Sequence, residues 1–148
     1  MPEDRDATPC HCQALRQAAR RVSALYDAAL APHGLRISQF AVLTRLRDEG
    51  GTSIQALADA LAMDRTTLGR ALRPLERDGL VAGGRAPADA RQRRLALTGE
   101  GRLRLEAARP AWAAVQARFE RDFGHARATL LHAELSAVQA ATILPPAR

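Results

Sequence analysis

The 148 residues are enough for one compact domain, and a hydrophobic content of 47% suffices to build its core without disulfides. No stretch approaches the ~20 apolar residues that span a bilayer, and residues 1–12 lack the basic and apolar regions of a secretion signal, so we expect a cytoplasmic protein without a membrane partner. The formal charge of +6 favours an anionic partner such as nucleic acid, although a GC-rich genome would also explain why arginine supplies every basic side chain.

Two cysteines near the N-terminus, Cys10 and Cys12, are one residue apart, where an intrachain disulfide would be strained. They are therefore interpreted as free thiols, either without a role or as a redox sensor. A soft metal is a further alternative, but Cys10, His11 and Cys12 in a row do not close easily around one ion, so no metal site is predicted. No histidine and acid partners, phosphate loop or paired carboxylates accompany the thiols, so neither enzymatic activity nor a cofactor is expected.

The first predicted helix, residues 12–30, carries one apolar stripe and is interrupted at Pro32 and Gly34. A second helix is expected to begin at a Ser38 cap and to end before Gly50. Its predicted inward residues are Phe40, Leu43 and Leu46.

Two helical segments separated by a short turn follow. Thr52 and Gln55 have the spacing of a capping box for the first segment, Asp64 is suited to cap the second, and Gly79 is suited to end it. The residues expected inside are Ile54, Leu57 and Leu61 on the first segment and Leu68, Leu72 and Leu75 on the second.

The segments 80–85 and 93–97 flank an expected exposed turn over residues 87–92, which predicts a two-stranded hairpin. A long helix then starts at Thr98 and is closed by Gly124, with Pro110 as an expected kink. The last predicted helix, about residues 126–143, carries a stripe formed by Leu131, Leu135 and Val138.

Positive charge is concentrated between residues 65 and 94, where eight arginines face three acidic residues, a net +5 out of the total +6. With its leucines inward, the helix that starts near residue 65 turns a cationic and polar face outward, and such a face suits the major groove of B-DNA. A solvated arginine-rich surface is the alternative, but the preceding helix and the following hairpin are the supports of a recognition helix. The predicted DNA contacts are Ser53, Gln55, Arg65, Thr66, Thr67, Arg70 and Arg73.

The hairpin tip adds Asp89, Arg91 and Arg93 to the predicted DNA contacts. Arg91 is suited to enter the narrow minor groove, where the negative potential is strongest over A·T tracts, while Asp89 holds its side chain. A mobile charged loop is the alternative.

Five segments, in this order and spacing, resemble the MarR family of winged helix-turn-helix regulators. They are Ser38-Gln39-Phe40, Leu57-Ala58, Leu75-Glu76-Arg77-Asp78-Gly79-Leu80-Val81, Asp89-x-Arg91 and Leu97-Thr98-x-x-Gly101. The resemblance implies a mainly α fold with a small β-hairpin wing, in which residues 1–148 form a single domain. A winged helix-turn-helix lobe spans about residues 36–100, and dimerisation helices span about 10–32 and 101–145.

The resemblance also implies a homodimer that binds a palindromic operator, usually as a repressor, and that a small aromatic or phenolic acid releases from DNA. The residues expected to line an effector pocket are Tyr26, His33, Phe40 and Trp112, with Arg16 and Arg20 to receive a carboxylate. Core packing for the aromatic residues and a solvated surface for the arginines are the alternatives. Other functions considered are a thiol-based redox-sensing regulator or small redox protein using Cys10 and Cys12, and an architectural DNA binder without sequence preference.

Overall fold

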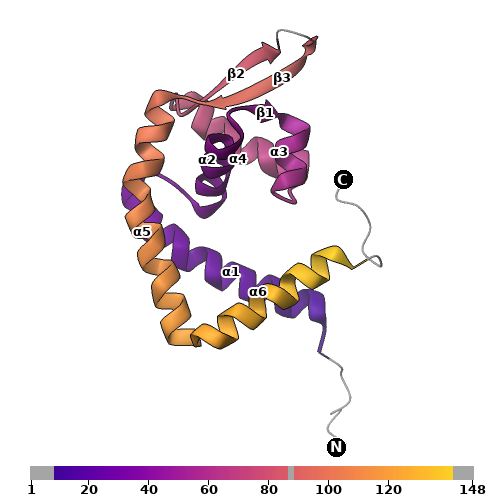
Figure 1. The fold of residues 1–148 in the computed structure, drawn as a ribbon, viewed down its shortest axis with the longest axis vertical. Coiled ribbons are helices and arrows are strands. Elements are labelled where there is room, and N and C mark those ends of the chain that lie inside the picture. The colour runs from indigo at the N-terminus through magenta and orange to yellow at the C-terminus, as the bar shows by residue number, and fades with distance from the viewer. Residues whose placement is uncertain (1–8, 87–88, 142–148) are drawn as a thin grey trace, which may run out of the picture.

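A computed structural model describes residues 9–86 and 89–141, without the side chains of residues 85–93. The chain is mainly helical with a small antiparallel sheet, which confirms the predicted fold class (Figure 1). In chain order the elements are α1 (His11–Leu30), the 3-10 helix η1 (Ala31–His33), α2 (Ile37–Glu49), β1 (Thr52–Ser53), α3 (Ile54–Ala60), α4 (Arg65–Arg77), β2 (Val81–Ala86), β3 (Asp89–Leu97), α5 (Gly99–Phe123) and α6 (His125–Ala140).

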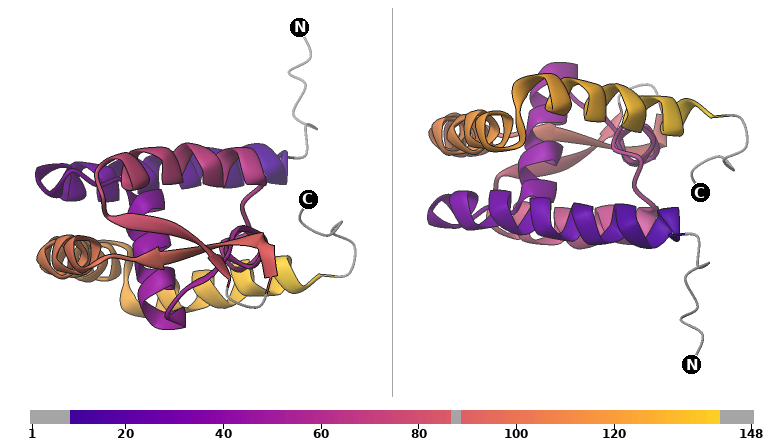
Figure 2. Two further views of the ribbon diagram at one scale, coloured as in Figure 1. Left: turned by 90° about the horizontal axis from the view of Figure 1, so that it is seen from above. Right: turned by 90° about the horizontal axis from the view of Figure 1, so that it is seen from below.

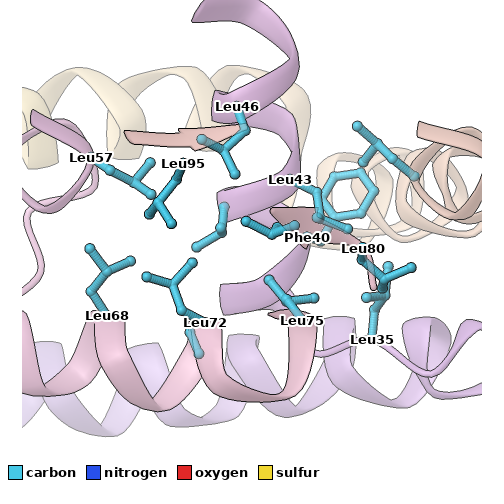
Figure 3. Close-up of a cluster of buried hydrophobic side chains, with 14 of the residues drawn as sticks. Leu35, Phe40, Leu43, Leu46, Leu57, Leu68, Leu72, Leu75, Leu80 and Leu95 are labelled. Atoms are coloured by element: carbon cyan, nitrogen blue, oxygen red, sulfur yellow. The ribbon is translucent and has the colours of Figure 1, made fainter. Parts of the chain in front are cut away.

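Leucine side chains from α2, α3, α4 and β3 meet in one buried cluster, inside the lobe expected for about residues 36–100 (Figure 3). Each fully buried leucine contributes about 1.5–3 kcal/mol of hydrophobic stabilisation. Because these leucines come from different elements, their contacts join one element to another. The core therefore fixes α4 relative to α2 and α3. Most of the predicted inward residues are buried, namely Phe40, Leu43, Leu46, Leu57, Leu68, Leu72 and Leu75. The other two, Ile54 and Leu61, are only partly buried against this core.

The predicted hairpin is confirmed as the antiparallel pair β2 and β3, and the sheet has a third strand that was not predicted, β1, in the order β1-β3-β2. Thr52 pairs with Leu95 and Val81 pairs with Leu97. A strand of two residues has no alternating pattern, so β1 gives no signal in the sequence. The strands also extend into the predicted turn, since β2 ends at Ala86 and β3 begins at Asp89; residues 87–88 of that turn lie outside the described residues.

Two predicted helix caps were wrong. Helix α2 begins at Ile37 rather than after Ser38, because Asp27 of α1 accepts a hydrogen bond from the Ile37 backbone N–H (2.7 Å). The Gln39 side chain accepts a second bond, from the backbone N–H of Arg36 (2.9 Å). The two acceptors at the start of α2 are thus the side chains of Asp27, on another helix, and Gln39, at the third helical position. Ser38 lies within the first turn and is not the cap.

Helix α3 is capped by Ser53 and not by the predicted pair of Thr52 and Gln55. The Ser53 hydroxyl oxygen accepts a hydrogen bond from the backbone N–H of Ala56 (3.1 Å). Thr52 is excluded from this role because it is extended and paired with β3. The predicted cap at Asp64 is confirmed, and Thr98, the predicted start of the long helix, caps α5 in the same way, since both side chains accept a backbone N–H three residues on.

Helices α1, α5 and α6 form a frame in which α5 runs from the base of the hairpin toward the opposite end of the molecule, where it meets α6 (Figure 1). Seen from below, α1 and α6 extend in the same direction away from α5 (Figure 2, right). Tyr26 of α1 is tied to α5, because its hydroxyl donates a hydrogen bond to Oε1 of Gln116. None of the described helices is both long and apolar enough to cross a membrane.

Candidate nucleic-acid interface

Helix α4 has two faces of opposite character. Leu68, Leu72 and Leu75 are buried against the lobe, so the other side of the helix points to solvent. The sequence prediction of its orientation is confirmed. The exposed side chains of α4 are Arg65, Thr66, Thr67, Arg70, Arg73 and Arg77.

The first turn of α4 is fixed by Asp64. One carboxylate oxygen accepts the backbone N–H of Thr67 (2.8 Å), and the other accepts the Thr67 hydroxyl (2.7 Å). The hydrogen bond from the Thr67 hydroxyl lowers the pKa of Asp64, and the backbone N–H of Thr67 adds to this effect. Since the Thr67 hydroxyl donates its proton to Asp64, the hydroxyl oxygen of Thr67 can only accept a hydrogen bond from a ligand.

Two of the predicted contact residues, Gln55 on α3 and Arg65 on α4, lie together. Oε1 of Gln55 accepts two hydrogen bonds from Arg65, one from Nε (3.0 Å) and one from Nη2 (2.6 Å). The Gln55 amide nitrogen donates in turn to Asp59 (2.8 Å), a residue that was not predicted to belong to the site. By contrast, the Ser53 hydroxyl is engaged as the cap of α3.

The hairpin places the other predicted contacts on β3. Asp89, Arg91 and Arg93 lie on this strand, but their side chains lie outside the described residues. Next to them, Arg94 donates a hydrogen bond from Nη2 to the Gly51 carbonyl (2.9 Å) and so ties the hairpin to the turn before α3. The spacing of Gly51 and Arg94 in the sequence gives no indication of this contact.

The residues expected to form an effector pocket are spread over several places. Phe40 is buried and stacks on Trp112, with ring centroids 5.7 Å apart. His33 is half-buried in η1, whereas Arg16 and Arg20 are exposed on α1. The structure therefore joins Phe40 and Trp112 but not the whole set.

Tyr26 faces a groove of about 780 Å³ between α1, α5 and α6. Burial raises the pKa of its hydroxyl, and the nearby Glu120 carboxylate raises it further, so this group stays protonated as a donor. The groove was missed in the sequence because it depends on three helices that are far apart along the chain. Its lining includes Leu15, Val22, Phe119, Leu131 and Leu135 together with the polar residues Gln116, Glu120, Thr129 and His132.

Cys10 and Cys12 are free and exposed at the start of α1. Cys10 is the N-terminal flanking residue of that helix, and Cys12 lies in its first turn.

A helix-turn-helix with an exposed cationic second helix, followed by an antiparallel hairpin, defines a winged helix-turn-helix DNA-binding protein. Residues 35–92 match the model of the MarR family. The transcriptional regulator MosR of M. tuberculosis, solved in complex with DNA, is 36% identical and has a TM-score of 0.74, with 89% of this chain and 98% of that chain covered. The chain belongs to the MarR family of transcription regulators and binds DNA, as the sequence motifs predicted. Proteins of this family are not enzymes.

Other similar proteins agree with this assignment. The transcriptional repressor CouR, bound to a 23-mer DNA duplex, is 27% identical with a TM-score of 0.81, over 94% of this chain and 99% of that chain. BpsR of Bordetella bronchiseptica, whose DNA binding is regulated by 6-hydroxynicotinic acid, is 26% identical with a TM-score of 0.81, over 95% and 99% of the two chains. The HTH-type transcriptional regulator TtmR of Methylorubrum extorquens (strain PA1) is 36% identical over 62% of this chain, and the match spans about half (47%) of TtmR.

Proposed function

We propose that this protein is a sequence-specific repressor that binds a palindromic operator as a homodimer and is released from it by a small ligand. The observation that carries this proposal is the exposed face of α4, where arginine and threonine side chains stand on a helix fixed by a buried leucine row. Arginine pairs with guanine through two hydrogen bonds, so such a face can distinguish sequences as well as bind phosphate.

The frame of α1, α5 and α6 supports a dimer. Several of its apolar side chains are 36–64% exposed, although the helices belong to a single small domain. A second copy would remove them from water, and a two-fold axis between copies would place two α4 helices on two half-sites of inverted sequence. The exposed residues are Leu15, Leu130, Leu131, Leu135 and Val138.

Selection of duplexes from a randomised pool with the purified protein tests the proposal directly. We expect an enriched inverted repeat whose half-sites are centred about one helical turn apart, roughly 10–10.5 base pairs. Failure to enrich any sequence would show that the protein binds DNA by charge alone.

Arg70→Ala tests whether α4 reads bases. We expect it to lower the preference for the selected duplex over a scrambled one by about 5- to 100-fold, the effect of losing one bidentate contact of ~1–3 kcal/mol. Arg77→Ala is the matched control, because Arg77 lies in the last turn of the same helix and is paired with Asp78 (2.9 Å). Equal loss of affinity on both duplexes for Arg70→Ala would contradict a base-reading role.

We propose a small aromatic or phenolic acid as the releasing ligand, by analogy with the relative that 6-hydroxynicotinic acid regulates. The candidate residues are the six expected from the sequence, Arg16, Arg20, Tyr26, His33, Phe40 and Trp112. Salicylate and 6-hydroxynicotinate, with their uncharged amides as controls, are the probes for a thermal-shift and DNA-release assay. Arg20→Ala is expected to weaken the response to the acids, and an unchanged response would remove this arginine from the site.

A second candidate function is redox sensing by Cys10 and Cys12. The observation that favours it is the exposure of both thiols at the start of α1, a helix that also lines the groove. Hydrogen peroxide is then expected to reduce DNA binding by the wild type, with recovery after dithiothreitol, but not by the variant Cys10→Ser/Cys12→Ser. Equal sensitivity of both proteins would rule the thiols out as the sensor.

A further inference from the structure

Three exposed polar side chains form a chain of hydrogen bonds that ends on the recognition helix. Asp59 accepts from the amide nitrogen of Gln55, and the amide oxygen of Gln55 accepts twice from Arg65. Asp59 and Gln55 are one turn apart on α3, whereas Arg65 is in the first turn of α4. This series of hydrogen bonds therefore crosses the turn between α3 and α4.

The carboxylate of Asp59 determines the direction of these hydrogen bonds. A carboxylate only accepts hydrogen bonds, so Asp59 holds the nitrogen end of the Gln55 amide toward itself. The oxygen end is then turned toward α4, where it binds two of the five N–H groups of Arg65. The remaining three N–H groups stay available, in an orientation set by the first two.

We propose that Asp59 is a positioning residue for DNA sequence recognition, acting through Gln55 to fix the guanidinium of Arg65 at the start of α4. The inference rests on the proposed sequence-specific function and extends it to a residue that contributes no favourable charge to DNA. In the free protein such exposed bonds contribute little to folding, since water competes for each group. At a DNA surface they matter more, because an arginine that is already oriented loses less side-chain entropy on binding.

The competing effect of Asp59 is simple repulsion between its carboxylate and the phosphates. Removing that charge would tighten binding to every sequence alike, whereas loss of a positioning effect lowers the preference for one sequence. The two effects are therefore separable by measuring affinity on two duplexes.

The experiment compares Asp59→Asn with Asp48→Asn, each in the wild type and in an Arg65→Ala background. Asp48 is the matched control because it loses the same charge and its carboxylate is bonded to Arg47 on α2 (2.8 Å) rather than to the recognition helix. The probes are the duplex that the wild type selects from a randomised pool and a scrambled duplex of the same length. Thermal melting of each variant checks that the fold is retained.

We expect Asp59→Asn to lower the preference for the selected duplex by about 3- to 10-fold, with an unchanged melting temperature, and Asp48→Asn to leave the preference unchanged. In the Arg65→Ala background Asp59→Asn should have no further effect on the preference between the two duplexes, since the positioned group is gone. Asp59→Glu, which retains an acceptor-only group, should restore part of the preference.

An equal change in affinity on both duplexes would overturn the inference, as would an effect of Asp59→Asn on the preference that persists without Arg65. Failure of the proposed function itself is a different result, namely a wild-type protein that prefers no duplex, and it would overturn both statements.

Discussion

At the scale of single residues, Gly101 is a point where α5 lies very close to the backbone that leads into β2. A Cβ atom at this position would lie 2.0 Å from the backbone oxygen of Leu80 and 2.7 Å from a side-chain carbon of Leu97. Backbone cannot move aside as a side-chain tip can, so we expect Gly101→Ala to destabilise the protein by about 1–3 kcal/mol in denaturant or thermal unfolding. Gly99→Ala, in the same helical turn but with open space around it, is expected to be neutral or slightly stabilising. Equal effects of the two substitutions would contradict this contact.

The cap of α4 makes a residue-scale prediction about pH. The hydrogen bonds from Thr67 lower the pKa of Asp64 in the folded protein, so this carboxylate stabilises the fold above the ordinary carboxyl pKa of roughly 4. The contribution is lost as the pH falls through the lowered folded value. Asp64→Asn keeps a capping side chain without the titrating group. The stability advantage of wild type over this variant is therefore expected to shrink below about pH 4 in urea unfolding, and an advantage that does not change with pH would contradict it.

At the scale of elements, the sequence predicted every α-helix because each carries a helical apolar stripe or a strong cap. It failed where a contact between distant segments decided the outcome. Ser38 is a better intrinsic cap than Arg36, yet Asp27 of another helix supplies the acceptor for α2. Thr52 has capping-box spacing, yet its pairing with Leu95 makes it a strand residue and moves the cap to Ser53. The residues next to each helix start do not reveal that Asp27 or Leu95 will bind there.

The hairpin of β2 and β3 carries a prediction of its own. Because Arg91 is the third residue of β3, close to the end that leads into the hairpin connection, we expect it to reach a narrow minor groove beside the half-site. Arg91→Ala should then weaken binding chiefly where the flanking sequence is A·T-rich, measured as affinity on duplexes that differ only in their flanks. Arg102→Ala, an exposed arginine at the start of α5, controls for the loss of charge. Equal losses on A·T-rich and G·C-rich flanks would show that Arg91 acts as a general phosphate contact.

At the scale of the whole molecule, the two functional parts differ in how well a sequence can predict them. The α4 face follows from the periodicity of one helix, so its orientation could be read directly from its leucines and arginines. The groove needs α1, α5 and α6 together, and of the six residues expected at an effector site it includes Tyr26 alone. Its apolar walls continue into the exposed leucines of α6, and on this ground we propose that the groove receives the second copy of the chain in the proposed homodimer.

Leu135→Glu tests that role of the groove. Leu135 lines the groove from α6 and is 36% exposed, so a carboxylate there would be buried without a partner when a second copy docks. We expect the variant to be monomeric by analytical ultracentrifugation at micromolar concentration and to lose binding to a two-half-site duplex. Leu103→Glu is the control, because Leu103 is 68% exposed on α5 and does not line the groove. A dimeric Leu135→Glu protein with full operator affinity would place the dimer contact elsewhere, whereas a monomer that still melts cooperatively would show that the lobe folds without its partner.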